Sequence, residues 1–344
     1  MEVLTSDMER LGIFSYAFDA VSPILLLVLL GYMLKKKRVF SEDFFKKLNK
    51  LAFDYCFAPM MFLNIYSIKH LGDIEFTFSA LLMFVIVVIT VVSFILASIL
   101  TNRKERKGVL IQAGFRSNFA IIGLPLVEGL VGAEAVVIAA AAQAPTIFYF
   151  NIVSVLCFAM YSKSAKIEPK RIALSIVKNP MIQGIAAAIV CLIIREMLPT
   201  DAEGNPVFTI QKNMKWLYTT LTYLNRIGTP LCLIALGGLF NITDVPDMKK
   251  EIAAGTLMRL VMAPVIGFAI SFAAQEMGFI TLTPTHIGIF VAVFGAPVAI
   301  SSAAMASQMD ADDVLAGQIV IWTCIFSMVT VFAMAAGFRA VGLL

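Results

Sequence analysis

Long blocks of apolar residues, separated by short polar segments, run through the whole chain. Ten of these blocks have about the 20 residues that a helix needs to cross the hydrocarbon core of a bilayer. The pattern predicts transmembrane helices over these ranges: Phe14–Leu34, Leu48–Tyr66, Phe76–Leu100, Gly108–Val131, Glu134–Tyr161, Ile172–Ile194, Trp216–Phe240, Ile252–Gln275, His286–Met309 and Leu315–Phe338. No polar segment between them is long enough to form a separate soluble domain.

Composition leads to the same fold class. Of the 344 residues, 60% are hydrophobic and 15% are charged, and the mean hydropathy is +0.88. A soluble domain has about 25% charged residues, so this chain could not cover a water-exposed surface. We therefore expect an all-α polytopic membrane protein with the lipid bilayer as its solvent.

The basic residues gather in alternate loops between the predicted helices. They cluster at 35–38, 103–107, 163–171 and 249–250, whereas the second loop has only Lys69 and the fourth has none. Because cytoplasmic loops carry the excess of Lys and Arg, both termini are predicted to lie on the non-cytoplasmic side of the cell membrane. A net charge of +4 arranged in this way gives no reason to expect a nucleic-acid partner.

Four short patterns occur in the same order in both halves of the chain. Because each half has five predicted helices, the second half enters the membrane from the opposite side, as in the inverted repeats of secondary transporters. The sequence thus predicts two repeats, residues 1–166 and 167–344. The matching segments are Val21–Pro23 and Lys178–Pro180, Leu51–Pro59 and Leu221–Pro230, Ser117–Gly123 and Ala296–Ser302, and Ala133–Val136 and Ala311–Val314.

A charged side chain, Arg116, lies well inside the fourth apolar block. A charge near the bilayer centre costs at least about 2.5–3.5 kcal/mol, so such a residue has a partner, a wet cavity or an anionic ligand. Gly123 and Pro125 weaken the helix nearby, and a broken helix directs partial positive charge from its N-terminal end at a ligand. The pattern favours an anion-binding site at Arg116; the alternative is a structural ion pair with a carboxylate such as Asp54.

The ninth block has a similar interruption. Pro297 removes a backbone donor, and Ser301 and Ser302 can replace lost hydrogen bonds or contact a carboxylate. Gly295 precedes this proline, and small residues here are also explained by close helix packing. We interpret the segment as a second helix break.

Other polar residues lie inside the apolar blocks. Arg226, beside Asn225, is a second anion contact or an ion-pair partner. Asp54 and Asn225 are the candidates for proton or ion coupling. Asp54 is either a proton carrier, since burial raises the pKa of a carboxyl group, or a member of a fixed ion pair. Four amides line a transport path or join helices by hydrogen bonds: Asn64, Gln143, Asn151 and Gln318.

Neither a cofactor nor a metal is expected. The five cysteines all lie in apolar blocks without a CxxC pair, and the chain has only two histidines. An HExxH or GxSxG motif is absent, so the sequence gives no indication of an enzyme.

Two motifs resemble segments of the auxin efflux carrier family, which includes plant PIN-type carriers and shorter bacterial organic-acid permeases. They are Arg116-Ser-Asn-Phe-Ala-Ile-Ile-Gly-Leu-Pro-Leu126 and Pro297-Val-Ala-Ile-Ser-Ser302. The resemblance implies a scaffold of helices one, two, six and seven and a transport domain of helices three to five and eight to ten. It also implies an elevator-type movement, with broken fourth and ninth helices crossing at the substrate. The residues at that crossing would be Arg116, Ser117, Asn118, Pro297, Ser301 and Ser302.

The chain also departs from the plant carriers. Their long cytoplasmic loop between helices five and six is here a short basic turn, and their proline-containing crossover is not reproduced around Phe115–Asn118. These differences favour a small carboxylate such as malate or malonate over auxin as the substrate.

Two other functions are weighed against an organic-anion carrier. A sodium-coupled bile-acid-type symporter would need acidic ligands at the crossing, but none occurs between Arg116 and Leu124 or between Phe294 and Met305. An anion channel would differ from a carrier in electrical recording. The sequence leaves the coupling ion, the direction of transport and a homodimeric state open.

Overall fold

The computed structural model describes residues 22–67, 75–161, 174, 177–200, 206–240 and 245–344. The first and sixth predicted helices begin outside the described residues. The N-terminus, Lys69 and the basic loop at 163–171 also lie outside them. Every regular element in the described part is a helix; extended backbone pairs only in two isolated bridges. The predicted all-α class is therefore confirmed.

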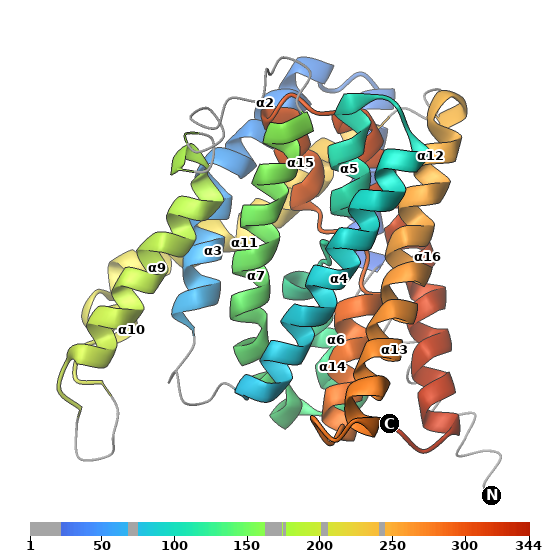
Figure 1. Ribbon diagram of the computed structural model, residues 1–344. Helices are drawn as coiled ribbons and strands as arrows, with labels where there is room; N and C mark the ends of the chain where they lie inside the picture. The colour runs from blue at the N-terminus through green and yellow to red at the C-terminus, as the bar shows by residue number, and fades with distance from the viewer. Residues whose placement is uncertain (1–21, 68–74, 162–173, 175–176, 201–205, 241–244) are drawn as a thin grey trace, which may run out of the picture.

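Helices run from residue 22 almost to the end of the chain (Figure 1). Three π-helical segments, η1, η3 and η5, interrupt or join longer α-helices. The elements after a first helix at residues 22–36 are α2 (Glu42–Leu51), η1 (Ala52–Cys56), α3 (Phe57–Tyr66), α4 (Phe76–Leu100), α5 (Lys104–Phe115), η3 (Phe119–Gly123), α6 (Leu124–Val131), α7 (Ala133–Tyr161), α9 (Pro180–Met197), α10 (Ile210–Asn213), α11 (Lys215–Leu239), α12 (Val245–Leu257), η5 (Met258–Met262), α13 (Ala263–Glu276), α14 (Pro284–Gly295), α15 (Ser301–Gln308) and α16 (Asp313–Ala340).

Four of the described helices are long and apolar enough to cross a membrane: Phe76–Leu100, Pro180–Met197, Pro246–Glu276 and Asp313–Ala340. Helix α7 adds a fifth when its two halves, bent by 41° beside Pro145, are taken as one span. Other predicted spans are interrupted, as in α5–α6 and α14–α15, or contain polar residues, as in α11. A multi-pass membrane protein is thus supported, while ten spans in two inverted repeats remain a prediction.

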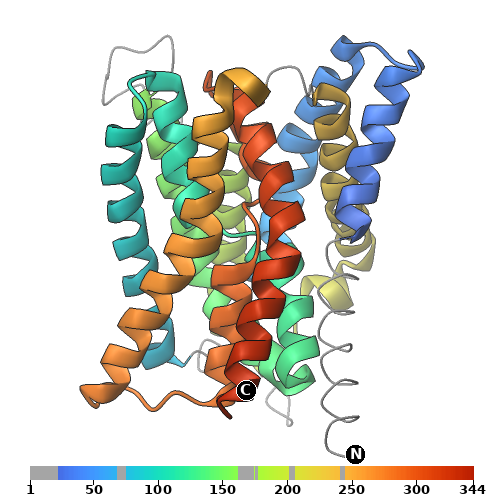
Figure 2. The ribbon, with the colours of Figure 1, turned by 90° about the vertical axis from the view of Figure 1, so that its right-hand side faces the viewer.

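The helices form two groups (Figure 2). Residues 22–36, α2 and α11 lie on one side of the molecule and α4 and α13 on the other, while α16 runs down the middle and packs against α12. Helix α3 packs between α9 and α11 in the first group, whereas α5 packs against α4 and α7 in the second. The packing of α3 on α9 is close: a Cβ at Gly184 would collide with the Ala58 carbonyl, so only glycine fits there.

A buried ion-pair network joins three elements at one end of the second group. Arg106, at the start of α5, donates to Glu251 Oε1 of α12 at 2.8 Å and to Asp312 Oδ2 before α16 at 3.0 Å. The Arg106 side chain is 6% exposed, and the two carboxylate side chains are 12% and 13% exposed. The starts of α5 and α12 and helix α2 lie at this end, while the C-terminus lies at the other (Figure 1).

A helix cap fixes the N-terminal end of α14. The Thr283 hydroxyl accepts from the His286 backbone N–H, and the His286 ring accepts from the Thr283 N–H. His286 Nε2 is 2.9 Å from Glu75 Oε2, and its ring stacks on Phe78 at 4.4 Å. These contacts tie the first half of the broken helix to the start of α4.

Candidate anion site

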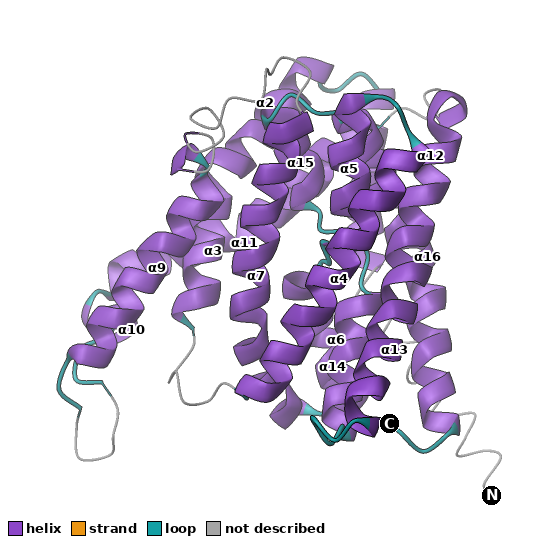
Figure 3. Cartoon of the chain, in the orientation of Figure 1, coloured by secondary structure: helices purple, strands orange, loops and turns teal. Residues whose placement is uncertain are grey.

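Two helices break at the same place in the interior of the molecule. Helix α5 ends at Phe115 and the chain resumes a helical course at Phe119, while α14 ends at Gly295 and α15 starts at Ser301. The segments between them cross as loops inside the helix bundle (Figure 3). The predicted fourth and ninth helices are therefore both interrupted.

The two loop segments pair with each other as short antiparallel strands would. Asn118 N donates to Pro297 O at 2.9 Å, and Ala299 N donates to Arg116 O at 3.1 Å. Ala296 is extended, with φ −61° and ψ 147°, as the steric demand of a following proline requires. This pairing satisfies backbone groups that would otherwise be unbonded in a membrane interior.

The first break lies earlier in the chain than the predicted positions. Gly123 is the last residue of η3, and Pro125 lies in the first turn of α6, which follows η3 without a gap. The interruption occurs instead at Arg116, Ser117 and Asn118. In the second break, Gly295 ends α14 and Pro297 lies in the loop, as expected.

Arg116 reaches from this crossing toward uncharged partners. Its Nη2 donates to Asn151 Oδ1 of α7 and to Ser301 Oγ, each at 2.9 Å. Its Nη1 is 3.3 Å from the Met305 sulfur, and the residue is 3% exposed. None of the ion pairs within the described ranges includes Arg116 or Asp54, so the alternative of a fixed pair between them receives no support.

Several buried polar atoms at the crossing have no hydrogen-bond partner in the described part of the chain. They are Ser117 Oγ, Asn118 Nδ2 and Ser302 Oγ, in residues that are 5%, 3% and 2% exposed. Buried polar groups are usually bonded, and leaving one unbonded costs about 1–3 kcal/mol. A polar ligand or water bound here would remove that cost.

A small cavity of about 40 Å³ lies beside Arg116, at the boundary between the two groups of helices. Its volume exceeds the roughly 10–15 Å³ needed for one water molecule. Met60 and Met61 of α3 and Met181 of α9 line it opposite the crossing, as does Thr229 of α11. Methionine side chains adapt their shape, so this wall can fit around the uncharged part of a ligand.

A second arginine at the crossing was missed in the sequence interpretation. Arg259 of η5 is 1% exposed and donates to the Gly114, Phe115, Val293 and Phe294 carbonyls. The signal was available, because Arg259 is a charged residue inside the eighth apolar block. Its partners are backbone atoms, which no side-chain pattern reveals.

Comparison with known proteins identifies the family. The model of the membrane transport protein family matches residues 16–189 and 185–335. This chain belongs to the membrane transport protein family. A protein of Methanothermobacter thermautotrophicus described as an uncharacterized transporter is 24% identical over 327 residues, which cover 92% of this chain and 97% of that protein. The match confirms the resemblance to auxin efflux carriers indicated by the two motifs.

Other residues expected at the transporter's site lie away from this cavity. Arg226 is exposed near the centre of α11, and Asn225 beside it is half-buried. Asp54 lies half-buried in η1, and Gln143 is buried in α7 with its Nε2 unbonded among the described residues. Asn151 alone among the four proposed path amides contacts Arg116 directly.

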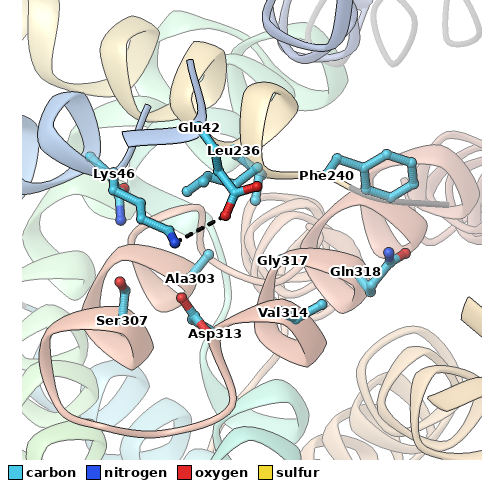
Figure 4. Close-up of a pocket in the computed structure, with 12 residues that line it drawn as sticks. Glu42, Lys46, Leu236, Phe240, Ala303, Ser307, Asp313, Val314, Gly317 and Gln318 are labelled. Carbon is cyan, nitrogen blue, oxygen red and sulfur yellow. Dashed lines mark ion pairs between the residues drawn. The ribbon is translucent and has the colours of Figure 1, made fainter. Parts of the chain in front are cut away.

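The transporter has a second cavity, of about 160 Å³, on another face of α15 (Figure 4). Helix α2 contributes Glu42 and Lys46, which form an ion pair at 2.9 Å, and the opposite wall contains Asp313 and Gln318. This cavity therefore also separates elements of the two helix groups. Among the described residues, no group of three His, Cys, Asp or Glu side chains could hold a metal ion.

Proposed function

We propose that this protein is a secondary transporter that moves small organic carboxylates across the cytoplasmic membrane. The observation that carries the proposal is Arg116, a buried guanidinium without a carboxylate partner in the described residues, held at the crossing of two broken helices. A charge in this position is explained by an anionic ligand that completes its environment.

The present partners of Arg116 are weak or uncharged acceptors, which favours their replacement by a carboxylate ligand. Thioether sulfur is a weak acceptor, and the Asn151 and Ser301 oxygens are uncharged. A carboxylate accepts two parallel N–H bonds from one guanidinium, and such charged bonds are stronger than neutral ones. Helix α15 starts at Ser301, so its partial positive charge favours the same ligand, and Ser117, Asn118 and Ser302 offer further polar contacts.

An elevator-type movement is consistent with the position of the cavity. Its lining comes from the crossing and α7 on one side and from α3, α9 and α11 on the other. We propose that the first set forms part of the transport domain and the second set part of the scaffold. Sliding of one against the other would expose Arg116 to each side of the membrane in turn, with both termini outside.

The size of the same cavity supports a small substrate. A volume of about 40 Å³ can be enlarged for a small ligand when the flexible methionine side chains move. We propose carboxylates of the size of malonate or malate. Proton coupling through Asp54 and assembly as a homodimer are further parts of this proposal.

Uptake into proteoliposomes tests the proposal. The purified protein should take up radiolabelled malonate or malate with saturable kinetics, and unlabelled carboxylates should compete where the corresponding neutral amides do not. Empty liposomes provide the background. Absence of uptake for every mono- and dicarboxylate, or currents of channel size in planar bilayers, would contradict a carboxylate carrier.

A further inference from the structure

Two helix C-termini converge at the crossing, close to the proposed anion-binding site. Helix α5 ends at Phe115 and α14 ends at Gly295. Each helix C-terminus has unbonded carbonyls and the equivalent of about half a negative elementary charge. Without compensation, these two ends would place about one negative charge beside a site for anions.

Arg259 occupies this position. Its Nη1 donates to Gly114 O at 3.2 Å and Phe115 O at 3.3 Å, both from the last turn of α5. Its Nη2 donates to Val293 O and Phe294 O, each at 2.8 Å, in the last turn of α14. One planar guanidinium therefore joins both helix ends, which the single point charge of a lysine could not reproduce.

Local structure brings the side chain to this point. The π-helical segment Met258–Met262 inserts a wider turn between α12 and α13, and Arg259 is its second residue. Such single π-helical turns are frequent at functional sites. With 1% of its surface exposed, Arg259 is turned wholly toward the crossing.

We propose that Arg259 is the electrostatic positioning residue of the anion site. Its charge compensates both helix C-termini, so that the neighbouring Arg116 remains available to a carboxylate ligand. Its fork geometry holds the two halves of the crossing in register. The positive charge of Arg259 thus governs substrate affinity. The planar guanidinium, whose two NH2 groups form the fork that bonds to both helix ends, governs the rate at which the assembled crossing moves.

The experiment compares Arg259→Gln and Arg259→Lys with the matched control Gly295→Ala in proteoliposomes. A Cβ at Gly295 would meet Met334 and Val331, so this control disturbs the packing of the same crossing without changing its charge. The readouts are KM and Vmax for carboxylate uptake and thermal stability in detergent. The experiment presupposes carboxylate uptake by the wild-type protein, the proposed function on which this role of Arg259 rests.

Loss of the charge in Arg259→Gln should raise KM about tenfold. Arg259→Lys should keep KM within about threefold of wild type while Vmax falls, because it retains charge but loses the fork. A purely structural residue would instead give parallel losses in all three variants, in proportion to stability. Such parallel losses would overturn the proposal. It would also be overturned by an unchanged KM in Arg259→Gln, or by a KM in Arg259→Lys as high as in Arg259→Gln.

Should Arg259→Gln not fold, Arg259→Lys and Gly295→Ala still decide between the two roles. The positioning role requires a near-normal KM with reduced Vmax in the lysine variant, and a raised KM there refutes it. Lack of uptake by the wild-type protein would refute the proposed function itself and is separately visible in the same assay.

Discussion

Replacing Arg116 by alanine should reduce carboxylate uptake at least about 100-fold in proteoliposomes. The change removes a guanidinium that is 3% exposed and the only cation among the residues that line the described cavity. Charged hydrogen bonds contribute about 1.5–3 kcal/mol each, and a bidentate carboxylate would lose two of them. Initial uptake rates at several substrate concentrations measure this effect.

Arg226→Ala provides the matched control. It removes a second arginine from an apolar block, but that residue is exposed on α11 and does not line the cavity beside Arg116. Uptake by this variant should stay within about threefold of wild type. Equal losses in the two variants would show that arginine content, rather than the crossing, determines transport.

Replacing Arg106 by methionine should lower the free energy of unfolding by about 3 kcal/mol. The change leaves Glu251 and Asp312, whose side chains are 12% and 13% exposed, without their shared partner. Breaking a buried ion pair by removing one member typically costs about 3–5 kcal/mol, and the slight exposure here reduces that value. Unfolding in mixed micelles of increasing SDS fraction measures the loss.

Lys46→Met is the control for this second prediction. Lys46 pairs with Glu42 at 2.9 Å, but their side chains are 61% and 54% exposed. An exposed ion pair within one helix contributes less than about 1 kcal/mol. A similar loss of stability in both variants would refute the structural role assigned to the Arg106 network.

The sequence allowed one helix and one of the two helix breaks to be located. Helix α4 has the bounds expected from its apolar block, Phe76–Leu100, because a continuous apolar run leaves little choice of ends. Pro297 marked the second break, since proline constrains its own backbone and that of the residue before it. The first break was predicted near Gly123 and Pro125 but lies at Arg116–Asn118, where no proline or glycine marks the interruption.

Other features depend on rotation and packing that periodicity does not determine. Arg226 lies at the middle of its helix as predicted, but whether it faces the cavity depends on how α11 is rotated against α3. The hydrogen bonds of Arg259 to backbone carbonyls leave no side-chain signature. Arg106 was assigned to a basic loop because its acidic partners are 145 and 206 residues away in the chain.

Thiol labelling at the crossing tests the central claim most directly. In a background with the five native cysteines replaced, Ser301→Cys places a thiol at the position that now accepts a bond from Arg116 at 2.9 Å. A negatively charged methanethiosulfonate reagent should modify it in membranes, because the site is wet and attracts anions, and the transported carboxylate should slow that reaction. Resistance to the reagent from both sides of the membrane, or labelling at a rate that carboxylate leaves unchanged, would contradict an anion site at the crossing.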